Sequence, residues 1–113
     1  GYQAMKELLK SSPDAVFATS DLMAAGAIRA IQEADLRVPQ DVAVVGFDDV
    51  PLDSILKVPL TTIRQPILKF GMTAVELLIN LTSNGKSPAK NIILETELIV
   101  RESCGAKSRA LQA

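Results

Sequence analysis

Three short polar segments of the chain carry the side chains best suited to hold a ligand. These segments are Thr19-Ser20-Asp21, Phe47-Asp48-Asp49 and Arg64-Gln65. Carboxylates that accept hydroxyl hydrogens, beside an amide or guanidinium donor and an aromatic ring, are how proteins hold sugars and related polyols. Asp48 and Gln65 offer the acceptor and the donor, and Phe47 is the candidate aromatic ring of the central segment. The residue types therefore indicate a site for a sugar-like molecule.

Each polar segment follows an apolar stretch that predicts a strand. We expect a short buried strand at residues 15–18 and a β-branched strand at 60–63. The Val/Ala/Gly composition of residues 42–46 is typical of a parallel strand covered on both faces. In open α/β sheets, ligands bind beyond the carboxyl ends of the strands. Ser20 and Asp48 are therefore expected to share one cleft, and the helix that Ser20 begins favours an oxygen-rich ligand there.

Structural roles explain the same residues as well. Asp48 and Asp49 are equally suited to capping the turn that follows, and Phe47 is equally suited to the core. Adjacent residues on a strand point to opposite faces, so the two carboxylates do not form an acid–base pair. The sequence contains no histidine, and no nucleophile has a plausible adjacent base without one. We therefore predict a binding protein with no catalytic residue and no cofactor, rather than an enzyme.

A magnesium site is an alternative use of the acidic residues. Asp21, Asp48 and Asp49 could imitate the acidic Mg²⁺ pocket of response-regulator-like domains, since carboxylate oxygens are ligands that this ion prefers. That pocket also needs a lysine at a strand end, and the sequence places none there. We therefore predict no metal site.

The composition is that of one compact domain without an electrostatic footprint for nucleic acid. The 113 residues include 12 basic and 13 acidic ones, so the charge is nearly balanced. The single cysteine, Cys104, excludes an internal disulfide and fits a reducing compartment. No apolar stretch is long enough to cross a membrane. We therefore expect a cytoplasmic protein with no membrane partner.

Alternating helices and strands predict an α/β fold with parallel crossovers. We expect helices at residues 2–11, from 20 or 21 to 34, and at 67–83, a short helix or turn at 50–57, further strands at 91–94 and 97–101, and a mobile tail after Ser103. The helices at 20–34 and 66–83 carry more apolar residues than one sheet-facing side requires. Both are therefore expected to pack against something outside this chain.

Four motifs, in order along the chain, resemble the lactose/galactose-repressor (LacI/GalR) family of bacterial transcriptional regulators. They are Ser20-Asp-Leu-Met-Ala-Ala-Gly-Ala-Ile-Arg-Ala30, Leu36-Arg-Val-Pro-Gln-Asp-Val-Ala-Val-Val-Gly-Phe-Asp-Asp49, Leu60-Thr-Thr-Ile-Arg-Gln-Pro66 and Glu97-Leu-Ile-Val-Arg-Glu-Ser103. The resemblance covers essentially the whole chain. It implies the C-terminal part of the effector-binding region, with the type I fold of periplasmic sugar-binding proteins, which has three layers around a mostly parallel sheet.

The resemblance also implies two lobes. Residues 1–64 and 95–106 would belong to one lobe, residues 66–94 would contribute to the other, and Arg64-Gln65-Pro66 matches a crossover between them. Family members begin with a helix-turn-helix headpiece and a hinge helix, and neither these nor the first half of the effector domain is found in this sequence. The parent protein is therefore expected to bind operator DNA through its headpiece, which this piece by itself should not do.

The family pattern also points to particular site residues. In the family, the residue at Asp48 contacts the small-molecule effector through its carboxylate, and the position at Ser20 is usually an asparagine that faces the effector. Together with Asp21, Phe47 and Gln65 from the strand ends, these residues make up the predicted effector-binding set. The expected effector is a sugar or related polyol, or a purine.

The dimerisation seam of the family falls on residues 52–57 and on the helix that carries Ala25. We therefore predict a homodimer. Its predicted interface residues are Met23, Ala25, Leu52, Ile55 and Leu56. Core packing explains Met23, Ala25 and Leu56 equally well. The predicted function is ligand sensing and dimerisation within a DNA-binding regulator, and the alternative is a periplasmic sugar-binding protein of a transport system, which shares the fold but works as a monomer.

Overall fold

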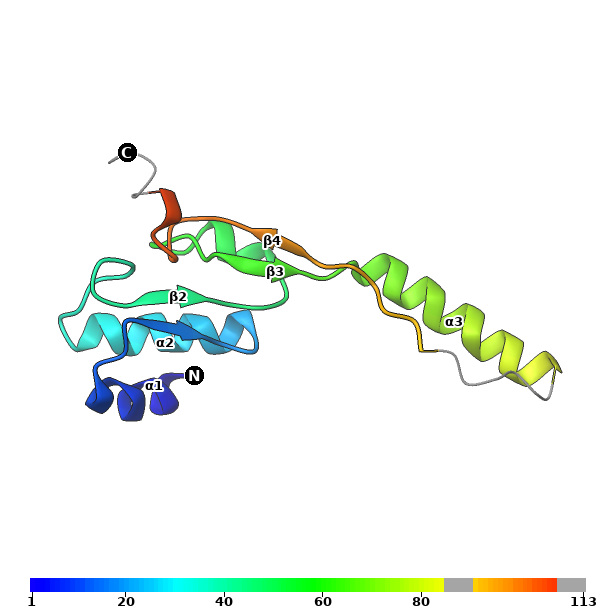
Figure 1. The fold of residues 1–113 in the computed structure, drawn as a ribbon, viewed down its shortest axis with the longest axis horizontal. Coiled ribbons are helices and arrows are strands. Elements are labelled where there is room, and N and C mark those ends of the chain that lie inside the picture. Colours follow the sequence, from blue (N-terminus) through cyan, green and yellow to red (C-terminus); the bar gives the residue numbers. More distant parts are fainter. Residues whose placement is uncertain (85–90, 108–113) are drawn as a thin grey trace. The chain divides into compact units, whose positions relative to one another are not determined.

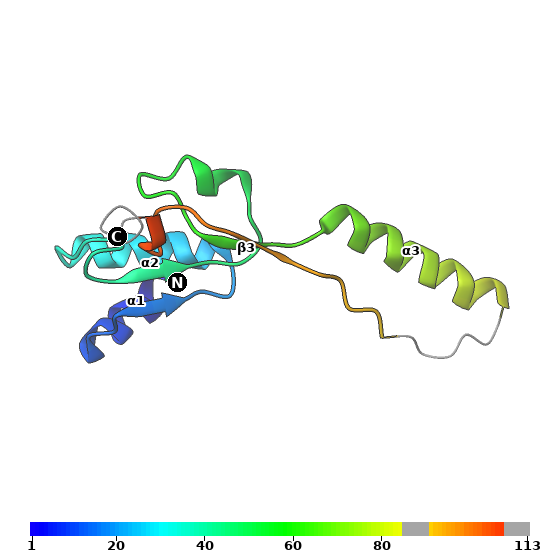
Figure 2. The same ribbon diagram turned by 45° about the horizontal axis from the view of Figure 1, so that its top comes forward.

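The computed structural model describes residues 1–84 and 91–107, and the chain divides into two compact units (Figure 1 and Figure 2). The first unit is Gly1–Arg64 with Leu98–Ala113, and the second is Gln65–Glu97. In chain order the elements are α1 (Tyr2–Leu8), the 3-10 helix η1 (Leu9–Ser11), β1 (Ala15–Phe17), α2 (Asp21–Glu33), β2 (Ala43–Val45), the 3-10 helix η2 (Pro51–Ser54), β3 (Thr62–Arg64), α3 (Ile67–Asn84) and β4 (Glu97–Ile99). None of the helices in the described ranges is long and apolar enough to cross a membrane.

Parallel pairing of β1 with β2 forms the centre of the first unit. The register places Ala15 opposite Ala43, Val16 opposite Val44 and Phe17 opposite Val45. Parallel bridges from Val45 to Thr61 and from Asp48 to Arg64 continue the pairing to the chain around β3, and β3 pairs with β4. The predicted α/β fold with a parallel sheet is therefore confirmed.

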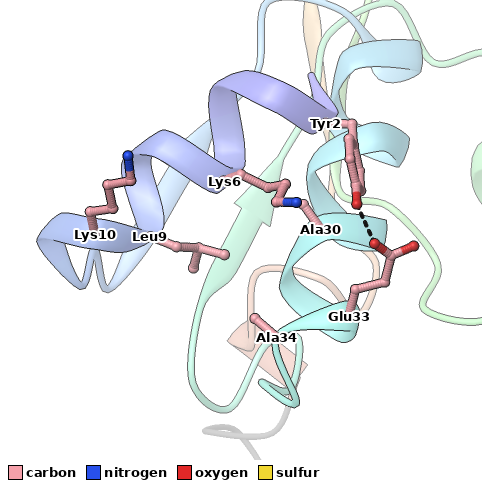
Figure 3. A pocket seen from close by; sticks show the side chains of 7 residues that line it. All are labelled: Tyr2, Lys6, Leu9, Lys10, Ala30, Glu33 and Ala34. Atoms are coloured by element: carbon pink, nitrogen blue, oxygen red, sulfur yellow. Dashed lines mark hydrogen bonds between the residues drawn. The ribbon is translucent and has the colours of Figure 1, made fainter.

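Helices α1 and α2 lie side by side against this sheet, as the close view of Figure 3 shows. Ser20 precedes α2, as predicted: its backbone is extended, and its hydroxyl accepts a hydrogen bond from the Met23 N–H at 3.3 Å. The core between the helices and the sheet includes Met5, Ile31 and Val44, none of which is more than 1% exposed. Their burial fixes the start of α2 relative to the carboxyl ends of β1 and β2.

One face of the sheet is more open than the sequence predicted. The expectation of a buried strand at residues 15–18 is wrong for Phe17, which is 59% exposed. Likewise, residues 42–46 are not fully covered on both faces, since Val45 is only half-buried. Alternate residues of a strand point to opposite faces, and it is the face of Val44 that packs against α1 and α2.

The second unit consists of α3 and the extended chain that follows it. Helix α3 begins directly after Pro66 and ends at Asn84, one residue beyond the predicted end, and residues 85–90 lie outside the described range. Large apolar side chains of α3 are exposed, including Leu68 at 80% and Phe70 at 62%. The described part of this unit therefore leaves much of its apolar surface uncovered.

One prediction for the chain after α3 needs correction. Residues 91–94 do not form a strand, and Ile93 is 93% exposed. A strand requires backbone hydrogen bonds to a neighbour, and no described strand pairs with this segment. The strand predicted at 97–101 is confirmed in its first part as β4. Of the tail predicted after Ser103, residues 104–107 form a turn and a helical stretch, and residues 108–113 lie outside the described range.

Candidate functional site

The polar segments after β1 and β2 lie side by side in the first unit. The Asp21 N–H donates to the Phe47 carbonyl at 2.9 Å, and the Asp48 N–H donates to the Ile63 carbonyl at 2.9 Å. These hydrogen bonds link the start of α2 to the chain after β2, and that chain to β3. The structure therefore brings together three residues of the predicted effector-binding set: Ser20, Phe47 and Asp48.

Gln65, another member of the predicted set, is the first residue of the second unit. Its neighbour Arg64 ends β3 and forms a parallel bridge with Asp48. The structure thus brings Arg64 to this edge of the sheet. The effector contact of Gln65 stays a prediction.

Asp48 and Asp49 hold unusual backbone conformations. Their φ angles are +128° and +60°, in the region that favours glycine. A conformation of this kind costs about 1–3 kcal/mol and persists only where the surroundings hold it. Asp48 and Asp49 are both half-buried as whole residues, and the side chain of Asp49 is only 8% exposed. The strained turn therefore buries the carboxylate of Asp49.

Two guanidinium groups hold the buried carboxylate of Asp49. Arg64 donates from Nε to Oδ2 at 2.6 Å, and Arg101 donates from Nη2 to Oδ1 at 2.6 Å. Burial alone would raise the pKa of Asp49, but Arg101 and Arg64 outweigh it and hold the pKa below its usual value of 3.8. Asp49 therefore has a structural role in the turn.

Asp21 lies beneath the turn rather than at its surface. It is 1% exposed, its Oδ1 atom accepts from the Thr62 hydroxyl at 2.6 Å, and its Oδ2 atom accepts from the Val50 N–H at 3.1 Å. Burial raises the pKa of Asp21, but hydrogen bonds, with that from Asp53 the largest, bring it below 3.8. In this unit Asp21 is thus closed to solvent and holds the turn from below.

Asp53, which sequence reasoning missed, completes the buried network. It is 1% exposed in η2, its Oδ2 atom has no hydrogen-bond partner among the described residues, and Nη1 of Arg101 lies 4.0 Å from that atom. Burial, together with the neighbouring Asp21 carboxyl group, raises the pKa of Asp53 to about 7. The sequence pattern does not indicate that Asp53 is buried, because a carboxylate in a short helix usually faces water.

Ser103 is the second residue that sequence reasoning missed. Its hydroxyl accepts from the Thr61 N–H at 2.8 Å and donates to the Val44 carbonyl at 2.6 Å. The Val44 N–H donates in turn to the Ser103 carbonyl at 2.8 Å. Ser103 is fully buried and joins β2 to the chain that leads into β3. The signal that could have found it is the motif that ends at this serine.

The predicted dimer residues divide between surface and core. Ile55 is 77% exposed, and Leu52 and Met23 are each 41% exposed. Leu56 packs against the core, and Ala25 is half-buried. Ile55, Leu52 and Met23 therefore offer accessible apolar surface, and their role in a dimer stays a prediction.

A hollow of 370 Å³ lies elsewhere in the first unit, between α1 and α2 (Figure 3). There the Tyr2 hydroxyl donates to the Glu33 carboxylate, and the Lys6 ammonium lies 5.4 Å from the centre of the Tyr2 ring. Arg29 also donates to Glu33, at 2.8 Å. These polar groups pair with one another and tie α1 to α2, so the hollow is explained by the packing of the two helices.

The strand-end residues suit binding better than catalysis. The Asp48 carboxylate can accept hydrogen bonds from a polyol, and the Ser20 hydroxyl can accept and donate them. Both residues are half-buried, and Phe47 directly precedes Asp48. Asp49 is held by two guanidiniums and is not placed to act as an acid or base with Asp48. Within residues 1–84 and 91–107, no three His, Cys, Asp or Glu side chains are grouped to hold a metal ion.

Comparison with known proteins identifies the family. The sequence model of the periplasmic binding protein-like domain matches residues 1–104. The lactose operon repressor of Rhizobium radiobacter is 47% identical over 105 residues, which are 91% of this chain and 92% of that protein. The chain belongs to the lactose/galactose-repressor family. The HTH-type transcriptional repressor MelR of Bacillus subtilis is 40% identical, over 96% of this chain and 32% of MelR.

Solved structures of repressor-family members have the same fold. The transcriptional regulator CelR in complex with cellobiose is 40% identical with a TM-score of 0.85, over 90% of this chain and 32% of that chain. The lac repressor dimer bound to operator and the anti-inducer ONPF is 38% identical with a TM-score of 0.81, over 90% of this chain and 36% of that chain. The chain thus spans about a third of the length of MelR and of both structures. The predicted periplasmic-binding-protein-like fold is confirmed, and these relatives are transcriptional regulators rather than transport proteins.

Proposed function

We propose that the chain is the C-terminal part of the effector-binding domain of a DNA-binding transcriptional regulator, and that a sugar-like effector binds at Ser20, Phe47 and Asp48. The observation that carries the proposal is the turn after β2. It carries the half-buried Asp48 beside the start of α2, in a strained conformation that the buried network around Asp49 supports. Family members have been solved with cellobiose, sucrose and ribose bound, which supports a sugar as the effector.

Each proposed contact follows from the chemistry of the side chain. The ionised carboxylate of Asp48 accepts hydrogen bonds from two hydroxyl groups, as vicinal hydroxyls of a sugar offer them. The Ser20 hydroxyl can donate and accept, and it stands at a helix N-terminus that favours ligand oxygen atoms. Asp21 acts from below by holding the Val50 N–H. No residue in this scheme forms or breaks a covalent bond, so the proposed activity is binding and not catalysis.

We also propose that residues 1–64 and 95–106 belong to one lobe of the effector domain and residues 66–94 to the other. The division of the chain after Arg64 and again before Leu98 supports this assignment. The exposed apolar side chains of α3 support a second lobe completed by other parts of a longer polypeptide, since such surfaces are rarely left open in water. An effector held between two lobes can change their closure and so couple ligand binding to DNA binding.

The rest of the longer protein would supply DNA binding, and the chain would supply dimerisation. We propose that a headpiece outside this chain contacts operator DNA and that two copies associate through Met23, Leu52 and Ile55. The exposure of these three side chains supports an interface, and one solved relative, the lac repressor, is a dimer bound to operator. A regulator of this kind works in the cytoplasm.

A thermal-shift screen of the full-length regulator tests the effector site. The panel holds cellobiose, sucrose, ribose, sugar phosphates and purines, each at a large excess. A ligand at a hundredfold its dissociation constant adds about 2.7 kcal/mol to the free energy of unfolding, so a bound sugar should raise the melting temperature by several degrees. Asp48→Asn should abolish the shift, because it removes the negative charge and replaces one of the two acceptor oxygens with an NH₂ donor.

The matched control is Asp14→Asn, which makes the same change at an exposed residue before β1. This variant should keep the shift in full. Sugar shifts of equal size in Asp48→Asn and in the unmodified protein would refute the site. A shift produced only by a purine would keep the site and change the effector class.

A further inference from the structure

Two buried carboxyl groups lie beneath the turn that carries Asp48. Asp21, at the start of α2, and Asp53, in η2, are each 1% exposed, and both residues form hydrogen bonds with the backbone of Val50. Two ionised carboxylates buried at one place repel each other, which favours a proton on one of them. Oδ2 of Asp53 has no hydrogen-bond partner among the described residues. Burial of both carboxyl groups and the unpartnered oxygen of Asp53 therefore favour one proton on the pair.

Three other charged or polar groups face this pair. The Thr62 hydroxyl, from β3, donates to Asp21 at 2.6 Å. Arg101, from the chain after β4, has Nη1 at 4.0 Å from Oδ2 of Asp53 but binds Asp49 more closely, through Nη2 at 2.6 Å. Asp49 adds a further negative charge near Asp53. Among the described residues, the guanidinium near Asp53 is that of Arg101, and it binds Asp49 more closely.

Asp21 and Asp53 both form hydrogen bonds with the backbone of Val50, in the turn. The Val50 N–H donates to Oδ2 of Asp21 at 3.1 Å, and the Val50 carbonyl accepts from the Asp53 N–H at 3.0 Å. The Asp53 carbonyl accepts from the Leu60 N–H at 2.9 Å, which anchors η2 to the chain before β3. Movement of the Asp21 carboxylate, or of the Asp53 backbone, would therefore move the residue that follows Asp48 and Asp49.

We propose that the proton shared by Asp21 and Asp53 is a latch on the turn at residues 48–50. The turn is held while the pair carries the proton and loosens when the proton is lost. Because this turn carries Asp48, the latch also makes effector binding weaken as the pH rises; that second step rests on the proposed function.

The direction of the effect follows from the acid that titrates. Burial and the adjacent Asp21 raise the pKa of Asp53 to about 7, so its proton passes to water near neutral pH. Between 3.8, the usual value, and about 7, the folded protein holds a proton that the unfolded chain has lost. The stability that the pair contributes is complete below the lower value and is lost as the pH rises through the higher one. The lowered pKa values of Asp21 and Asp49 have the opposite effect, and only below 3.8.

Nuclear magnetic resonance of the isotope-labelled chain tests the latch. The carboxyl carbon of Asp53 should titrate near neutral pH, and the Val50 N–H should shift with the same midpoint because it bonds to Asp21. In Asp53→Asn, whose amide keeps the size of the side chain and donates to Asp21 without titrating, the Val50 shift should be independent of pH. Asp14→Asn, at an exposed aspartate, should leave the titration unchanged.

Hydrogen exchange measures the loosening itself. Corrected for the intrinsic rate, protection of the Val50 N–H should fall about tenfold between about pH 6 and about pH 8 in the unmodified chain and stay constant in Asp53→Asn. An Asp53 carboxyl carbon that titrates near its usual value would overturn the proposal. So would Val50 protection that falls equally in both proteins. The carboxyl titration needs no variant, so it decides the matter even if Asp53→Asn does not fold.

Binding of cellobiose, sucrose and ribose to the full-length regulator at about pH 6 and about pH 8 separates the latch from the proposed function. Sugar affinity that falls several-fold at the higher pH, and does not in Asp53→Asn, supports both. A titrating Val50 with no sugar bound at either pH supports the latch and contradicts the sugar site. Sugar affinity that is equal at both values overturns the coupling of latch to site while the sugar site stands.

Discussion

At the scale of single residues, Ser103 joins two strands through one hydroxyl group. It accepts from the Thr61 N–H and donates to the Val44 carbonyl, and both partners lie in the buried part of the sheet. A buried backbone group that loses its partner costs about 1–3 kcal/mol. The serine is therefore expected to matter more for stability than its place near the end of the chain suggests.

We predict that Ser103→Ala lowers the free energy of unfolding by about 2–4 kcal/mol, because it leaves both backbone groups unpaired. Denaturant unfolding of the chain measures the difference. The matched control is Ser54→Ala, which removes the hydroxyl of an exposed serine that bonds only to the Pro51 carbonyl nearby. It should change stability by less than about 0.5 kcal/mol. Equal losses in the two variants would contradict the bridging role.

Sequence reasoning succeeded for residues whose partners are close in the chain. Ser20 was recognisable as a helix cap because the N–H that it accepts belongs to Met23, three positions on. The partners of the missed roles are remote: Ser103 meets Val44 across 59 positions, and Asp21 meets Thr62 across 41. Periodicity and composition carry no information on such pairs. The sequence therefore could not show whether Asp21 is buried in a structural role or contacts a ligand.

At the scale of elements, the end of β2 lies so close to the start of α2 that only glycine fits. A Cβ atom on Gly46 would lie 2.3 Å from Oδ1 of Asp21 and 2.9 Å from Cδ2 of Leu60. Both neighbours are buried, and Oδ1 of Asp21 is held by the Thr62 hydroxyl. Residue 46 therefore has to be glycine if Asp21 is to keep its buried position.

We predict that Gly46→Ala destabilises the chain by about 1–3 kcal/mol, the usual cost of overpacking a core. The same substitution in α3, Gly71→Ala, serves as the control, because a Cβ there meets nothing within 4 Å. It should instead stabilise the helix by up to about 1 kcal/mol. Thermal unfolding of both variants checks the opposite signs. A neutral Gly46→Ala would show that Asp21 can move without cost.

The type of most elements was predictable, whereas their surroundings were not. The apolar spacing of α2 and α3 and the apolar composition of β2 identified these elements correctly. The same rules cannot tell whether an apolar segment has a neighbour to pair with or pack on. Residues 91–94 have the composition of a strand without a described partner, and Phe17 has that of a core residue but is 59% exposed.

At the scale of the whole molecule, the exposed apolar residues of η2 and α2 should govern association. We predict that Ile55→Asp converts a dimeric full-length regulator to a monomer, because Ile55 is 77% exposed and a buried unpaired carboxylate would oppose the interface. Light scattering over a range of concentrations measures the mass. Leu8→Asp, at a 46% exposed position on α1 outside the predicted interface, is the control and should leave the mass unchanged.

The first unit is built from two segments that are separate in the chain, and this affects its folding during synthesis. Arg101 and Ser103 are made after α3, yet they complete the sheet and the network around Asp49 that begin some forty to sixty residues earlier. While the ribosome is still adding α3, β2 and the chain before β3 lack the hydroxyl that joins them, and Asp49 lacks one of its two guanidiniums. We therefore expect the nascent chain to remain open to proteases and chaperones until this last segment emerges, and to close only then.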